Sequence, residues 1–178
     1  MARKASNGSL DSPRVTPLAV TSLQVSLFLH ITAVVVGFGT TFAESITFPI
    51  AMKLDKRHLP YVHRLQRTIN SFFATPALVV VLATGFYQAD KLNFSLGDLW
   101  LSASLALVGM IAVLNVGYFI PQDRKLEAMV TQELASVADA DIQLSDQYLR
   151  RSRLTGIAGA LTGVMLIVII YLMVTKPV

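Results

Sequence analysis

Four long apolar blocks, each almost free of charged side chains, organise this sequence. They cover about residues 17–43, 69–88, 98–120 and 154–174. A helix rises about 1.5 Å per residue, so about 20 residues cross a hydrocarbon core of about 30 Å, and each block is long enough. The runs are continuous rather than alternating, which excludes the pattern of a membrane β-barrel. The sequence therefore predicts an all-α polytopic membrane protein with four transmembrane helices in a bundle.

Polar segments between the blocks define the domain organisation. Residues 1–16 predict a flexible tail, and residues 17–178 predict a single four-helix transmembrane domain. The first apolar block is too long for the core of a signal peptide, so we expect it to stay in the mature protein. Pro49 is expected to end or kink the first helix, and a loop is expected over residues 49–68.

The segment 121–153 is too long for a turn and carries a helical pattern of its own. Its apolar residues recur at helical spacing, at Leu126, Met129, Val130, Leu134 and Val137. This pattern indicates an amphipathic helix that continues from the third span. A second helix is expected to begin at Ser145 or Asp146 and to run into the fourth span. The resulting hairpin either shields its own apolar faces or docks on a partner or on the membrane surface.

Basic residues are concentrated on one side of the predicted membrane. Five Lys or Arg residues lie in each of the loops 49–68 and 121–153. Three lie in the tail, one lies after the second span and one lies at the C-terminus. The positive-inside rule therefore predicts both loops in the cytoplasm and both termini outside. The basic stretch 53–67, which includes His58, Tyr61 and His63, either anchors this topology or binds anionic lipid headgroups.

Composition and motifs narrow the class of function. The chain is 53% hydrophobic and 15% charged, with a formal net charge of +4. The excess positive charge lies in membrane-flanking loops, so it does not indicate nucleic-acid binding. The chain has no cysteine, and we find no P-loop, dinucleotide fingerprint, zinc-protease motif or nucleophile elbow. These features favour a non-enzymatic integral membrane protein of unassigned role, without a metal site.

A seam of polar and small residues follows one face of the first span. At about 100° per residue, this face carries Ser26, His30, Ala33, Gly37, Thr41 and Glu44. The opposite face is bulky and apolar, with Phe28, Ile31, Val35, Phe38 and Phe42. Polar groups that face lipid without a partner are costly. We therefore expect the seam, together with Asn115 of the third span, to face the bundle interior.

The fourth span offers a second small-residue surface in the stretch TGIAGALTG. Gly159 and Gly163 form a GxxxG pair, and Gly156 lies on the same broad face. Small residues let two helices approach closely. The surface either packs within the chain, for example against the first span, or joins two copies in a homo-oligomer.

His30 is the main candidate for chemistry, because an ionisable side chain inside a span is a functional candidate by default. In a structural role, neutral His30 hydrogen-bonds a neighbour, with Asn115, Thr75 and Ser104 as the candidates. As an axial haem ligand it needs a second ligand, and the candidates at similar depth are Met110 and Met165.

A third role places His30 and Glu44 on a path for protons or ions. The two residues lie about 21 Å apart along the helix, too far for direct transfer. Thr40, Thr41 and water would have to bridge them. The sequence is compatible with all three roles of His30.

The stretch LHITAVVVGFG, followed by a basic loop and three further spans, resembles a known family. It is similar to the predicted integral membrane proteins of the domain of unknown function family 2269, over about residues 20–175. That family resembles a wider group with a histidine in the first span, which includes copper-resistance D-type proteins and the membrane protoporphyrinogen oxidase. The resemblance implies a four-span fold without an assigned activity. It also matches His30 to the first-span histidine, which in the oxidase relatives is linked to haem.

Overall fold

The computed structural model describes residues 20–136 and 142–177. These residues form helices and short connections, without a strand. Four continuous helical rods within them are long and apolar enough to cross a membrane: Ser22–Lys53, Lys56–Lys91, Leu99–Ala135 and Asp146–Thr175. The predicted all-α bundle with four candidate spans is thereby confirmed. The expected tail 1–16 and Val137 lie outside the described residues.

Helix α1 (Ser22–Lys53) begins at a capping box and continues past its proline. The Thr21 hydroxyl accepts a hydrogen bond from the Gln24 backbone N–H, and the Gln24 side chain accepts one from the Thr21 N–H. The sequence predicted that Pro49 would either end or kink this helix. Pro49 does not end it. It lies in the last two turns, where its missing N–H removes a single backbone bond.

The second and third rods each consist of two α-helices joined by a π-helical segment. The second rod starts with a 3₁₀ turn (Lys56–His58) and continues through α2 (Leu59–Ile69), the π segment Asn70–Ala74 and α3 (Thr75–Lys91). The third consists of α4 (Leu99–Leu114), the π segment Asn115–Phe119 and α5 (Ile120–Ala135). Helix α5 is the helix that the sequence predicted as a continuation of the third span.

Helix α2 occupies much of the segment that was expected as a loop over 49–68. Its basic residues share one side, whereas Leu59, Val62 and His63 are buried on the other. Pro60 suits the first turn, because the N–H that proline lacks has no helical partner there. The segment is thus an amphipathic helix, which its many basic residues did not indicate.

Helix α6 (Asp146–Thr175) begins where the sequence predicted, with Ser145 as its N-cap. The Ser145 hydroxyl accepts a hydrogen bond from the Tyr148 N–H. Glu133 of α5 in turn accepts hydrogen bonds from the Ser145 N–H, at 3.1 Å, and from the Ser145 hydroxyl. These bonds tie the start of α6 to the end of α5, which closes the expected helical hairpin.

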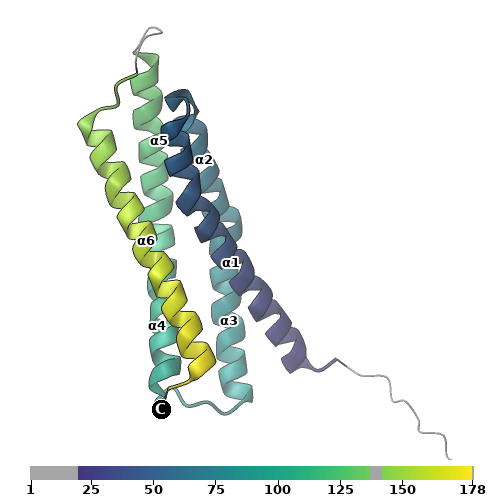
Figure 1. Cartoon of the computed structure of the whole chain (residues 1–178). Coiled ribbons are helices and arrows are strands. Elements are labelled where there is room, and N and C mark those ends of the chain that lie inside the picture. The colour runs from purple at the N-terminus through teal and green to yellow at the C-terminus, as the bar shows by residue number, and fades with distance from the viewer. Residues whose placement is uncertain (1–19, 137–141, 178) are drawn as a thin grey trace, which may run out of the picture.

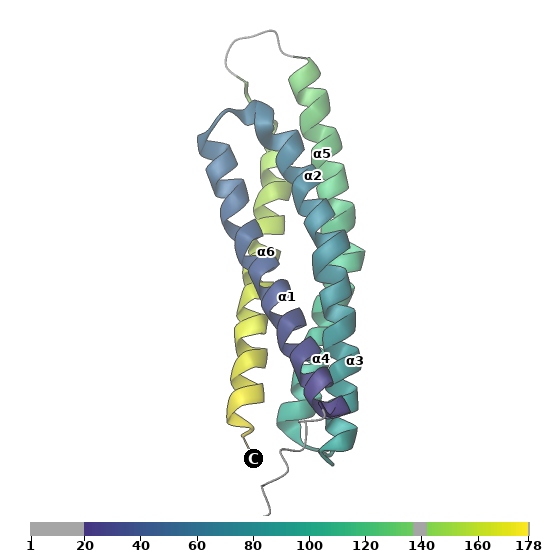
Figure 2. The same cartoon turned by 90° about the vertical axis from the view of Figure 1, so that its right-hand side faces the viewer.

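The four rods run antiparallel to their chain neighbours, and α1 crosses the bundle obliquely (Figures 1 and 2). Helix α1 packs mainly on α3, α2 on α5, and α4 on α6. The turn from α1 to α2, the end of α5 and the start of α6 lie at one end, which we call the loop end (Figure 1). The start of α1, the turn from α3 to α4 and the end of α6 lie at the other, which we call the terminal end.

Each of the two π segments accommodates a proline of its rod, and the two segments lie at the same height in the bundle. Pro76 and Pro121 lie two residues after the ends of these segments, and a proline ring clashes with the carbonyl four residues earlier in an α-helix. In the wider turns, the Thr75 N–H donates to the Asn70 carbonyl, and the Ile120 N–H donates to the Asn115 carbonyl. The Asn115 side chain crosses between the rods and donates to Thr75 Oγ1 at 2.9 Å. The two irregular turns therefore support each other.

The distribution of exposed apolar side chains is that of a protein in a bilayer rather than in water. The outer face of α1 leaves large apolar side chains exposed, among them Phe28, Ile31, Val35 and Phe42. The rods have 30 to 37 residues, although about 20 are enough to cross the hydrocarbon core. At the loop end the surplus length is packed around a cluster of Ala51, Leu59, Val62, Leu126, Val130 and Tyr148.

Candidate ligand-binding site

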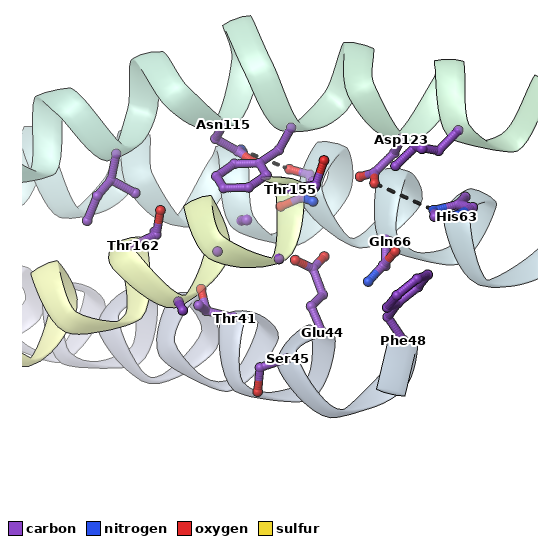
Figure 3. Close-up of a pocket in the computed structure, with 18 of the residues that line it drawn as sticks. Thr41, Glu44, Ser45, Phe48, His63, Gln66, Asn115, Asp123, Thr155 and Thr162 are labelled. Atoms are coloured by element: carbon purple, nitrogen blue, oxygen red, sulfur yellow. Dashed lines mark hydrogen bonds and ion pairs between the residues drawn. The ribbon is translucent and has the colours of Figure 1, made fainter. Parts of the chain in front are cut away.

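A cavity of about 340 Å³ lies inside the bundle, between the middle and the loop end. Its walls come from the second half of α1, from α2, α3, α4 and α5 with the two π segments, and from α6 (Figure 3). The volume falls within the range of small-molecule sites, about 300–1,000 Å³. We call this space the central cavity.

The end of the central cavity nearer the loop end is polar. Glu44 reaches into it from α1, and Gln66, His63 and Asp123 lie across from it on α2 and α5 (Figure 3). The Asn70 side chain interacts with the carboxyl groups of both Glu44 and Asp123. Two carboxyl groups from distant parts of the sequence thus face one space.

His63 connects this polar end to the core of the loop end. Only 2% of its surface is exposed, and its Nε2 lies 2.7 Å from the hydroxyl of Tyr148. Its Nδ1 lies 3.9 Å from Oδ1 of Asp123, which is 4% exposed. The Asp123 carboxyl thus lies beside a buried imidazole at the cavity wall, and the Tyr148 hydroxyl fixes the orientation of that imidazole.

Several buried polar atoms at this end have no hydrogen-bond partner among the described residues. They are Oε1 of Glu44, Nδ1 of His63 and Oγ of Ser152, and all three residues line the central cavity. Buried polar atoms in folded proteins nearly always have a partner. These atoms therefore offer hydrogen bonds to a molecule inside the cavity.

The opposite end of the central cavity is apolar and is shaped by glycines of α6. Gly156, Gly159 and Ala160 line it together with Leu78, Ile111 and Leu166. A Cβ added at Gly156, Gly159 or Gly163 would meet no other heavy atom of the described residues within 4 Å. Among the described residues, no neighbouring helix therefore packs closely on these glycines, and their alternative role of joining two copies stays a prediction. Two of them make room for the cavity.

A family model described as a predicted integral membrane protein (DUF2269) matches residues 24–177. The chain belongs to this family. The match covers all four rods, so the DUF2269 chain is a multi-pass integral membrane protein of unknown function. No curated protein and no solved structure matches it. The resemblance to copper-resistance proteins and the protoporphyrinogen oxidase is not part of this finding.

His30 of the DUF2269 chain lies outside the central cavity, at the contact between α1 and α3. Its Nδ1 lies 2.8 Å from Oγ1 of Thr84, and its ring packs on Gly85. The partner is thus Thr84 and none of the three candidates that the sequence suggested. At the height of His30, α1 packs on α3. The three candidates have other partners, because Asn115 and Thr75 bond each other and Ser104 bonds a carbonyl of its own helix.

The arrangement does not favour haem between His30 and Met165. Met165 is packed in an apolar cluster with Val108, Ile111 and Ile169, and neither ligand candidate lines the central cavity. The Nδ1 atom of His30 is engaged by Thr84. His30 and Met165 therefore do not share the central cavity in this DUF2269 protein. Met110, the other candidate, is 54% exposed and does not line the central cavity either.

The seam of α1 divides between two places. Gly37, Thr41 and Glu44 line the central cavity with Asn115, whereas Ser26 lies near the terminal end beside Gln88. The Thr41 hydroxyl donates to the Gly37 carbonyl of its own helix, and so does the Thr40 hydroxyl. His30 and Glu44 thus belong to different surroundings.

Sequence reasoning did not identify His63, Asn70 and Asp123 as site residues. The sequence does contain a signal for the two π segments, one of which begins at Asn70. An asparagine stands six residues before a proline in both middle rods, at Asn70–Pro76 and at Asn115–Pro121. The repeated spacing marks the two π segments, which are frequent at functional sites. His63 and Asp123 instead fell within segments expected to flank the membrane.

The basic stretch 53–67 is partly occupied by contacts within the chain. Arg64 and Arg67 bind the Glu127 carboxylate at 2.8 and 3.1 Å. The Lys56 ammonium donates to the Ile142 carbonyl at 2.6 Å. These contacts fasten α2 to α5 and to the connection that follows it.

Proposed function

We propose that this DUF2269 protein is a non-enzymatic integral membrane protein that binds a small amphipathic molecule in the central cavity. The observation that carries the proposal is the cavity itself, about 340 Å³ in volume, with a polar and an apolar end. Mostly apolar walls with a few converging polar groups are the usual features of a small-molecule site.

The two ends of the central cavity match the two parts of an amphipathic ligand. An apolar tail would lie along Gly159, Ile111 and Leu166. A polar headgroup would meet the unpartnered atoms of Glu44, His63 and Ser152. Burying the tail releases it from water, and pairing the headgroup avoids leaving buried polar groups unsatisfied.

Conduction along the seam of α1 has less support than ligand binding. The threonine hydroxyls that would bridge His30 and Glu44 donate to the Gly37 carbonyl of their own helix. Binding needs only the groups that already line one space. Haem binding stays a prediction from the resemblance, and a Soret band in protein expressed with added haem is its test.

The charge distribution supports the placement of the loop end in the cytoplasm, with both termini outside. In that orientation a ligand reaches the polar end of the cavity from the cytoplasmic leaflet. Lys53 and the exposed Tyr61 would then lie where anionic headgroups gather. A reporter fused after residue 130 is expected to be cytoplasmic, and an external location would contradict this orientation.

Filling the cavity tests the proposed function. Gly159→Leu places a side chain where a Cβ meets no other described atom, so the fold should tolerate it. Gly109→Leu is the matched control, because Gly109 is equally uncrowded and does not line the central cavity. Each variant and the unsubstituted protein are purified separately in phosphatidylcholine nanodiscs. An amphiphile with an eight-carbon tail, octylamine or octanol, is added, and the bound molecules are counted by native mass spectrometry. Binding in all but Gly159→Leu supports the proposal, and equal binding in all three contradicts it.

A further inference from the structure

We propose that the central cavity selects amphiphiles with a cationic headgroup, of the alkylammonium class, and that Glu44 and Asp123 recognise the charge. This inference rests on the proposed function and adds the chemistry of the ligand. Its basis is the juxtaposition of two carboxyl groups, from α1 and α5, around one space (Figure 3).

Two carboxyl groups line the central cavity, and neither a lysine nor an arginine does so among its described residues. The one histidine of the lining, His63, is buried. The arginines of α2, Arg64 and Arg67, bind Glu127, and Arg67 also acts on the Asp123 carboxyl through its charge. A buried carboxylate is costly unless an opposite charge accompanies it, and a cationic ligand supplies that charge.

The acceptors at the polar end suit the three N–H donors of a primary ammonium. Oε1 of Glu44 is buried and has no hydrogen-bond partner among the described residues. Ser152, only 6% exposed, lines the same space with an equally unpartnered Oγ. Asp123 adds carboxyl oxygens that lie beside the buried His63 ring. Charge-assisted hydrogen bonds of this kind are about twice as strong as neutral ones.

The same end disfavours an anionic headgroup. A carboxylate or sulfate would lie against Glu44 and Asp123, with no cationic side chain of the described lining to offset the repulsion. A neutral alcohol would fill the space and form hydrogen bonds but leave the charges uncompensated. The expected order of affinity is therefore ammonium, alcohol, carboxylate.

Three ligands with one tail separate the headgroup effect from the cavity itself. Octylamine, octanol and octanoate are titrated against the protein in phosphatidylcholine nanodiscs, at a pH where octylamine is protonated. Binding is followed by native mass spectrometry and by the shift of the unfolding temperature. Octylamine is expected to bind about tenfold or more tightly than octanol, as for a hydrogen bond to a charged group.

Isosteric variants assign the preference to its residues. Glu44→Gln and Asp123→Asn keep size and remove charge, and each is expected to lower the preference for octylamine over octanol about tenfold. Asp90→Asn is the matched control, because the exposed Asp90 lies at the terminal end, and it should leave the preference unchanged. If both cavity variants misfold, the ratio between the three ligands in the unsubstituted protein still decides.

The outcomes separate the two proposals. Equal binding of octylamine and octanol, abolished by Gly159→Leu, would refute the cationic preference and leave the amphiphile site intact. A preference for octylamine that survives in the Glu44→Gln, Asp123→Asn double variant would also refute it. Binding that is insensitive to Gly159→Leu would remove the site and the inference with it.

Discussion

The loop end and the terminal end of the bundle are held together by different kinds of contact. At the loop end, buried polar side chains bond across helices: His63 with Tyr148, and Glu133 with Ser145. Toward the terminal end, the buried Ser104 bonds the Trp100 carbonyl of its own helix, and the packed cluster is Ala89, Trp100 and Leu101. Bonds between helices also occur toward the terminal end, from Tyr87 to Ser22 and from Gln88 to Ser26, but they lie at exposed or half-buried positions.

This difference teaches how one bundle can combine stability with a cavity. Apolar helices in lipid gain little from the hydrophobic effect between them, so packing and hydrogen bonds must position them. Cross-helix bonds at the loop end hold α2, α5 and α6 around a space that their side chains do not fill. The following substitutions test whether the two ends differ energetically as they differ in their contacts.

The largest effect is expected at Tyr148, which is fully buried in the loop-end cluster. Tyr148→Ala should lower the free energy of unfolding by about 3–5 kcal/mol, because it leaves a large void in that cluster. Unfolding is followed in detergent by denaturant titration. A loss below about 1 kcal/mol would show that the loop end is not packed as a core.

Tyrosine-to-phenylalanine substitutions compare the two ends directly. Tyr148→Phe removes the partner of the buried His63 and should cost about 1–3 kcal/mol. Tyr87→Phe removes an exposed hydrogen bond to the Ser22 hydroxyl near the terminal end and should cost less than about 0.5 kcal/mol. Equal losses in the same titration would contradict the asymmetry between the ends.

A second matched pair of buried polar residues compares the middle of the bundle with the terminal end. Asn115→Ala deletes the side chain that joins the two π segments and should cost about 1–3 kcal/mol. Ser104→Ala deletes a hydroxyl bonded to the carbonyl four residues earlier in its own helix, and the change should stay within about 0.5 kcal/mol. If Ser104→Ala proves the more damaging, cross-helix bonds are not what positions the rods.

The fold could be read from the sequence because its signals are long and redundant. Four charge-free blocks leave helices as the main solution in lipid, and Ser145 has the residue type of an N-cap. The start of α2 at Leu59 was not predicted, because the basic residues of the segment, Arg64 and Arg67 among them, led to its assignment as a loop.

The candidate site was harder to predict, because it depends on which helices are neighbours. Glu44 could be placed on the inner face of its helix from periodicity alone. Its meeting with Asp123 depends on α5 continuing the third rod past a proline, and on the π segment that shifts the helical phase before it. His30 attracted attention because it is ionisable at mid-span, yet a single threonine of α3 provides its partner.

Among the substitutions at the loop end, the smallest effect is expected where charge rather than packing joins the helices. Arg67→Ala removes one of the two arginines on Glu127, while Arg64 stays at 2.8 Å from the same carboxylate. The Arg67 side chain is 31% exposed, so solvent screens part of its charge, and the loss should be about 0.5–1 kcal/mol. Salt screens such contacts, and the difference from the unsubstituted protein should shrink between low and high ionic strength. A loss that does not depend on salt would assign the role of Arg67 to the packing of its aliphatic stem, so that apolar contact and not charge would join α2 to α5 there.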